Sequence, residues 1–214
     1  MGMGSRAKIL QEARDLFYKN GYLATSVDDI IAAADVSKSN FYYHFKSKED
    51  LGIAVLDSRC QEFETLLAGS LCNSLIPPRH RLKVFVEMLS GATEDHGPGG
   101  CPFGNLVAEM SDHSERFRKQ LSSLFCGLAT VISDVIAEGQ VQGEIRRDIT
   151  PRDAATLVVQ ALQGAHLLLK CHKSRETYQY GMDLLLRLFE PGAAMSAPIT
   201  PGRTSNVRDD SALA

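Results

Sequence analysis

The stretch from Ser37 to Lys48 constrains the fold most, because its pattern suits a short helix with two different faces. Ser37 is a typical N-cap residue, and Ser47 is another, placed just before a long helical pattern. Phe41 and Phe45 are four residues apart, so they share one helical face. The other positions carry hydroxyl, amide, aromatic and basic side chains without a carboxylate, a set suited to phosphates and base edges. A solvated surface helix is the alternative, but exposed aromatic side chains count against it.

Two helical patterns precede this stretch, and the three together predict a helix-turn-helix. An amphipathic pattern covers 6–20, and Gly21 follows as the residue that ends the helix. Ser26 caps a second helix, with Asp29 three residues later completing a capping box. Asp35 then occupies a tight turn before the third helix. In this arrangement the third helix reads the major groove of DNA.

The segment from Thr25 to Leu51 resembles the N-terminal domain of the TetR family of transcriptional repressors. It reads TSVDDIIAAADVSKSNFYYHFKSKEDL, and the resemblance runs through the segment without a gap. Two positions depart from the family pattern, because Asp35 and Ser39 stand where glycine is usual or frequent. Aspartate tolerates a left-handed conformation better than most residues, so the turn is expected to persist at a small cost. Both departures leave the operator sequence open.

The resemblance implies a head that binds double-stranded operator DNA and a helical body that binds a small-molecule effector. It implies that Lys48 and Thr25 hold phosphates, while Lys38, Asn40 and Tyr42 reach base edges. The full set of expected DNA-binding residues is Thr25, Ser26, Lys38, Ser39, Asn40, Tyr42, Tyr43, His44, Lys46 and Lys48.

Charge is distributed unevenly along the chain, which reconciles DNA binding with a net charge of −3. Basic residues outnumber acidic ones up to Lys48, and acidic residues outnumber basic ones beyond it. This pattern confines the attraction for DNA to the head.

The five cysteines lack a paired spacing, and no signal-peptide pattern is present. No apolar run approaches the roughly 20 residues of a membrane helix, so we expect a cytoplasmic location and no membrane partner.

Six further helical patterns follow the head without any strand pattern, so the predicted fold is all-α with about nine helices. They cover about 48–72, 77–91, 102–111, 114–142, 151–171 and 174–190. The segment 93–100 is expected to be a glycine-containing loop. We predict a helix-turn-helix DNA-binding domain at 1–48, a ligand-binding and dimerisation domain at 49–190, and a disordered tail at 191–214.

The last two helical patterns carry more apolar surface than one small body needs. An internal core is the alternative explanation. The resemblance implies a homodimer through the last two helices, because TetR-like repressors form a four-helix bundle there. A two-fold dimer presents two reading helices to two half-sites. The apolar positions are Leu157, Val158, Ala161, Leu162, Ala165, Leu168 and Leu169, then Met182, Leu184, Leu185, Leu186, Leu188 and Phe189.

The resemblance to the TetR family implies a regulatory ligand site in the body. Aromatic side chains from several helices, mixed with a few polar groups, are typical of a ligand pocket. Each of these residues is alternatively plain core, and His166 is alternatively a histidine satisfied by a neighbour. The expected ligand-binding residues are Phe63, Leu67, Met88, Cys101, Phe103, Asn105, Phe125, Gln163 and His166.

Cys101 is the sharper candidate, because it precedes Pro102 at the expected start of a helix. A thiol at an N-cap feels the positive end of the helix dipole, which favours a lowered pKa and more thiolate. The stretch 100–106 resembles one found in a subset of TetR-like regulators, some of which sense electrophiles or oxidants with this cysteine. The alternative is a small buried residue at a tight turn, since no basic residue is close in sequence.

A catalytic interpretation would pair Cys101 with His96 or His113. Neither a third group nor an oxyanion site is apparent, and the head would then have no role. No His, Cys or Asp set shows the spacing of metal ligands either. We therefore expect a regulator without catalytic residues, metal or cofactor. The other four cysteines, on apolar helix faces, are interpreted as packing residues.

Overall fold

The computed structural model describes residues 4–96 and 99–192, without the side chains of 91–96, and these residues form nine α-helices and no strand. The all-α prediction is confirmed. The helices are α1 (Ser5–Asn20), α2 (Val27–Ala34), α3 (Lys38–His44), α4 (Lys48–Gly69), α5 (Pro78–His96), α6 (Pro102–Met110), α7 (Glu115–Gln142), α8 (Pro151–His172) and α9 (Arg175–Leu188).

The helix starts follow from capping side chains. Ser26 Oγ accepts a hydrogen bond from the Asp29 amide at 3.0 Å, and the Asp29 carboxylate accepts one from the Ser26 amide at 2.8 Å. Ser37 and Ser47 cap α3 and α4 in the same way. Asp35 has φ 50° and ψ 55°, the left-handed conformation predicted for this turn. Each cap satisfies an amide that the first helical turn leaves unbonded.

Two predicted helix ends are wrong. α4 ends at Gly69 rather than near residue 72, because Ser70 leaves the helical conformation with φ −122° and ψ −95°. α5 runs through Gly91 to His96, so the loop expected at 93–100 is helical in its first part. One glycine lowers helix stability by only about 1 kcal/mol, which is not enough to end a helix. Of the tail expected at 191–214, residues 193–214 lie outside the described part of the chain.

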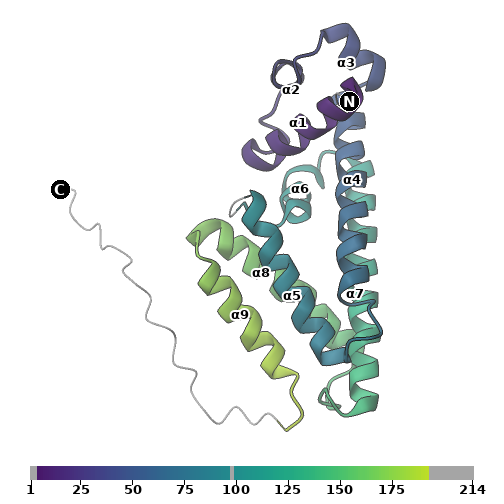
Figure 1. The fold of residues 1–214 in the computed structure, drawn as a ribbon, viewed down its shortest axis with the longest axis vertical. Helices are drawn as coiled ribbons and strands as arrows, with labels where there is room; N and C mark the ends of the chain where they lie inside the picture. Colours follow the sequence, from purple (N-terminus) through teal and green to yellow (C-terminus); the bar gives the residue numbers. More distant parts are fainter. Residues whose placement is uncertain (1–3, 97–98, 193–214) are drawn as a thin grey trace, which may run out of the picture.

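The head shares a hydrophobic core with part of the body. Ile9 and Phe41 of the head belong to one cluster with Leu51 of α4, Leu106 of α6 and Phe117 of α7. Figure 1 shows α6 beside α1, where the head meets the body, and α4 running from the head along the body. A displacement of α4 or α6 would therefore shift side chains in the core of the head.

A second cluster fills the body between α5, α7, α8 and α9, with Phe85, Ile132, Val158 and Met182 among its buried residues. By length and composition alone, α7 and α8 are apolar enough to cross a membrane, contrary to the sequence expectation. Both helices instead contribute side chains to this core, and core helices share that composition.

The outer faces of α8 and α9 carry apolar side chains that the described part of the chain leaves exposed. Leu157 is 50% exposed, Leu168 48% and Leu188 42%. A Cβ added at Gly164 or Gly181 would meet no atom within 4 Å, so both glycines face open space. Not every predicted position lies here. Leu185 is only 9% exposed and belongs to the body core, so it is not a residue of this outer face.

Candidate DNA interface and effector cavity

Helix α3 has one buried and one exposed face, as its sequence predicts. Phe41 is fully buried and Phe45 nearly so, and both pack into the core of the head. Tyr43 is 78% exposed and Tyr42 43% exposed, and the Tyr43 ring lies 4.9 Å from the His44 ring. Lys46 is also exposed. The structure thus presents aromatic, imidazole and basic groups together on one surface of the head.

Several predicted contact residues already have partners within the head. Ser39 hydrogen-bonds the Ser37 hydroxyl at 3.0 Å, and Lys38 Nζ lies 3.3 Å from the Asp28 carboxylate. The Ser26 hydroxyl donates to Asp29 at 2.7 Å. Asn40 Oδ1 is buried and makes no hydrogen bond within the described residues.

The expected phosphate contact of Thr25 is corrected by the structure, because this side chain is buried. It is 1% exposed, and its hydroxyl donates to the Gly21 carbonyl at 2.8 Å. Its position closes the α1–α2 turn, so its hydroxyl is not offered to a phosphate.

Lys48 lies at the first residue of α4, where the head joins the body. Its Nζ donates to the Leu23 carbonyl at 3.4 Å and lies 4.4 Å from the centre of the Tyr22 ring. Burial lowers the pKa of Lys48, and the carboxylates of Glu109 and Asp29 oppose that shift. These contacts hold the lysine at the edge of the head surface.

A cavity of about 260 Å³ lies in the body, walled by α1, α4, α5, α7, α8 and the start of α6. Of the expected ligand-binding residues, six line it together. They are Phe63, Cys101, Phe103, Phe125, Gln163 and His166. Leu67, Met88 and Asn105 do not line it, because their neighbours Leu66 and Leu89 take the two apolar positions, and Asn105 donates to the Gly99 carbonyl at 3.0 Å.

Cys101 caps α6 as predicted, and its Sγ accepts a hydrogen bond from the Gly104 amide at 3.4 Å. The predicted lowering of its pKa is wrong. Burial raises the pKa of Cys101 despite the hydrogen bonds from Gly104, Phe103 and Gln163 and the nearby positive charge of Arg59. Placing a thiolate in this apolar wall costs more free energy than the helix dipole and the hydrogen bonds return.

The cavity end of α6 fits closely against α8. A Cβ on Gly104 would lie 2.6 Å from Oε1 of Gln163, so a larger residue would force the Gln163 side chain to move. His166 Nδ1 is 2.8 Å from the Leu162 carbonyl, and its ring lies 5.0 Å from the Tyr178 ring. Burial lowers the pKa of His166, which keeps the imidazole neutral at pH 7.

Sequence reasoning missed Arg14, Tyr18, Arg59 and Glu62, which all line the cavity. A signal for Arg59 was present. It falls four residues after Val55 and four before Phe63, on the apolar side of the α4 pattern. A charge at such a position must find a buried environment.

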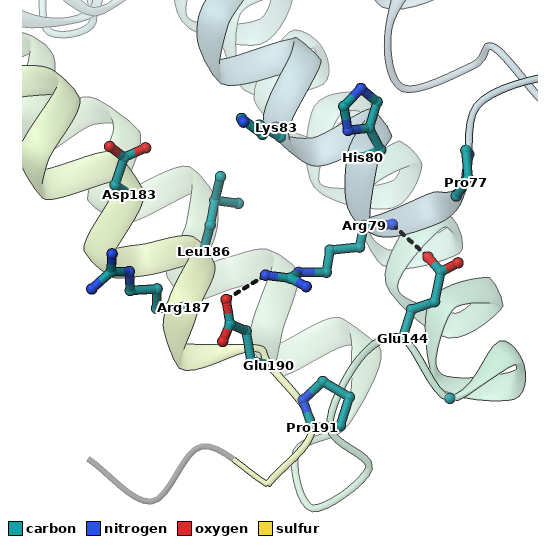
Figure 2. Close-up of a pocket in the computed structure, with 11 residues that line it drawn as sticks. Pro77, Arg79, His80, Lys83, Glu144, Asp183, Leu186, Arg187, Glu190 and Pro191 are labelled. Atoms are coloured by element: carbon teal, nitrogen blue, oxygen red, sulfur yellow. Dashed lines mark hydrogen bonds and ion pairs between the residues drawn. The ribbon is translucent and has the colours of Figure 1, made fainter. Parts of the chain in front are cut away.

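A second hollow, of about 790 Å³, lies between α5, α9 and the α7–α8 connection (Figure 2). Arg79 forms an ion pair with Glu190 across it, and the Arg79 amide donates to Glu144 at 3.1 Å. Lys83 pairs instead with Glu87, which does not line the hollow. Most of its side chains are exposed. Its apolar side chains are Pro77, Leu186 and Pro191, so it lacks the largely apolar walls of a ligand site.

The catalytic and metal alternatives gain no support. His113 is exposed beyond the far end of α6 from Cys101, and the side chain of His96 lies outside the described part. Among the described residues, no three His, Cys, Asp or Glu side chains gather as metal ligands.

The interpretation of four cysteines as packing residues is corrected for three of them, because Cys72, Cys126 and Cys171 are exposed. Cys60 is half-buried.

A capped three-helix head with an exposed third helix defines a helix-turn-helix DNA-binding protein. Residues 9–55 match the model for bacterial regulatory proteins of the tetR family, and residues 78–185 match the tetracyclin repressor-like C-terminal domain. The chain therefore belongs to the TetR family of transcriptional regulators.

Individual relatives agree with this assignment. The HTH-type transcriptional repressor DhaR of Mycobacterium sp. (strain GP1) is 33% identical over 190 residues, covering 87% of this chain and 92% of the relative. A regulator in the lacX 3′ region of Lactococcus lactis is 34% identical over 87% of this chain and 93% of its own. The crystal structure of a TetR regulatory protein from Rhodobacter sphaeroides has a TM-score of 0.79 at 27% identity, covering 85% and 97% of the two chains. These relatives are regulators of transcription and not enzymes.

Proposed function

We propose that this protein is a cytoplasmic homodimeric repressor that leaves its operator when a small molecule occupies the body cavity. The observation that carries the proposal is that α4 starts at Lys48 in the head and supplies Arg59, Phe63 and Leu66 to the cavity wall. TetR-family regulators bind operator DNA and small-molecule effectors and act as dimers. The same helix therefore contacts both the DNA-binding head and the effector cavity.

Helix α6 offers a second connection between cavity and head. Its first turn, with Phe103, lines the cavity, and Glu109 near its other end accepts a hydrogen bond from the Leu23 amide at 2.9 Å. Leu23 lies in the α1–α2 turn and also holds Lys48 through its carbonyl. A ligand that displaces α4 or α6 would tilt the two heads of the dimer. Their spacing would then no longer match the half-sites, provided the ligand binds the tilted state more tightly.

The proposed dimer uses the exposed outer faces of α8 and α9. Leu157 and Leu168 lie eleven residues apart on α8, with Gly164 between them, so they share one face. Glycines that face open space allow two helices to approach closely. A two-fold axis here would bury Leu157, Leu168 and Leu188 from both protomers.

Lys48→Ala is expected to weaken binding to all DNA sequences about equally, because a phosphate contact carries no sequence information. The slope of log affinity against log salt should fall by about one unit. Lys38→Ala is the matched control, since it removes the same charge from the first residue of α3. It should instead relax discrimination, at about 1–3 kcal/mol per lost base contact. Equal affinity of wild type and Lys48→Ala at every salt concentration would rule out this docking.

A reversible ligand is favoured over a thiol switch, because burial raises the pKa of Cys101 and disfavours the reactive thiolate. To test this, a thiol-reactive quinone is added to the operator complex of wild type and of Cys101→Ser, and release is followed by gel shift. We expect the two proteins to respond equally. Release of the wild type alone would replace the reversible ligand by a covalent adduct at Cys101.

A further inference from the structure

Arg59 is a buried cation that forms no ion pair with a carboxylate in the part of the chain that the structure describes. Its residue is 8% exposed, and it lines the cavity from the middle of α4. Within the described residues, the only hydrogen bond it makes runs from Nη2 to the Arg14 carbonyl at 3.2 Å, and no carboxylate lies within ion-pair distance. A guanidinium has five N–H donors, so most of its donor capacity is unused.

A neighbouring carboxylate that acts on Arg59 is already paired with another residue. Glu62, one turn along α4, forms a bidentate ion pair with Arg14 of α1. The second contact of Arg59 is with the Tyr18 ring, whose centre lies 5.5 Å from Cζ. Burial, with the neighbouring Arg14 charge, lowers the pKa of Arg59 to about 10, so it remains charged at neutral pH.

The cavity as a whole therefore has a positive charge. Its charged lining residues are Arg14 and Arg59 against Glu62, which leaves a single positive charge. His166 does not add to it, because its lowered pKa keeps it neutral. The charges of Glu62 and Asp15 offset the burial of Arg59 only in part, because its pKa stays below the ordinary value. A bound anion in the cavity would stabilise this guanidinium further.

The rest of the wall specifies the other end of such a ligand. Phe63, Phe85, Phe103 and Phe125 line the cavity, and the Phe63 and Phe103 rings are 5.5 Å apart. Their surfaces suit an aromatic or aliphatic body. Gln163 lies in the same wall and offers a neutral polar group. The volume of about 260 Å³ limits the body to a small molecule.

We infer that the effector of this cavity is a small carboxylic acid, bound as its carboxylate to Arg59 with its apolar body among the phenylalanine rings. The planar guanidinium fork matches the two oxygens of a carboxylate, which explains an arginine at this position rather than a lysine. This inference rests on the proposed function for its regulatory meaning, but the binding itself does not depend on it.

The test is calorimetric titration of the free protein at pH 7.5 with benzoate, phenylacetate, hexanoate and octanoate, each beside its neutral amide. At least one acid should bind wild type about tenfold or more tighter than its amide. Arg59→Met should bring the acid to the affinity of the amide. Arg116→Met is the matched control, because Arg116 is exposed on α7 and outside the cavity, and it should bind as wild type does.

Acids that bind no better than their amides, including a panel in which nothing binds, would overturn the inference. So would an Arg59→Met protein that keeps the wild-type preference. The comparison of acid and amide on wild type stands even if the variant does not fold. Operator release is measured separately. If acids bind through Arg59 without releasing the operator, the proposed function is contradicted. If only neutral compounds release the operator, the proposed function stands and the inference of an acidic effector is contradicted.

Discussion

Leu168→Glu is expected to turn the dimer into monomers that retain their fold. Leu168 is 48% exposed in the single chain, so the new carboxylate is solvated in the monomer. At the proposed two-fold it would be buried without a partner, twice, at a cost on the order of 3–5 kcal/mol for each uncompensated charge. Operator affinity should fall strongly as well, because a monomer presents one reading helix to two half-sites.

Sedimentation velocity at micromolar concentration, with circular dichroism as a check of folding, measures this result. The matched control is Leu75→Glu, which makes the same change at a residue that is 93% exposed between α4 and α5. It should remain a dimer. A Leu168→Glu protein that sediments as the wild-type dimer would show that the bundle is formed elsewhere.

Phe41→Ala is expected to lower the free energy of unfolding by about 3–5 kcal/mol, as large-to-small changes of buried aromatic residues do. Phe41 is fully buried and packs with Phe45 and Tyr42, at ring distances of 6.2 and 5.2 Å. The cavity left behind would open the core between α1, α2 and α3. Urea denaturation at a fixed protein concentration gives the change.

Tyr43→Ala is the control on the same helix. Its side chain is 78% exposed, so stability should change by no more than about 0.5 kcal/mol. DNA binding should weaken in both variants, for different reasons. A stability loss of equal size in the two proteins would mean that α3 does not bury Phe41 as described.

The head was predictable because its information is local. The Ser26–Asp29 box, the Asp35 turn and the spacing of Phe41 and Phe45 each involve residues within four positions. Helix ends were less predictable where no strong cap exists. Gly91 looked like a terminus, yet α5 continues past it to His96, because one glycine lowers helix stability by only about 1 kcal/mol.

The cavity was predictable only in part, because helical periodicity fixes a face to within about one residue, or roughly 100°. Leu66 and Leu89 line it in place of the expected Leu67 and Met88 for that reason. Cys101 shows a different limit. Its helix-dipole environment is readable from neighbouring residues, but the burial that dominates its pKa comes from helices far away in sequence. The sequence alone could not show that Arg59 lacks an ion-pair partner, because the pairing of Glu62 with Arg14 of α1 joins residues far apart in sequence.

Selection from a random duplex library with the full-length protein, followed by fluorescence anisotropy on the enriched site, tests the regulatory role most directly. A repressor of this architecture should enrich a palindromic sequence with two half-sites, which it binds about 10³-fold or more tighter than a scrambled duplex at physiological salt. The same affinity for the enriched and scrambled duplexes, or no enrichment at all, would contradict the assignment of α3 as a reader of operator DNA.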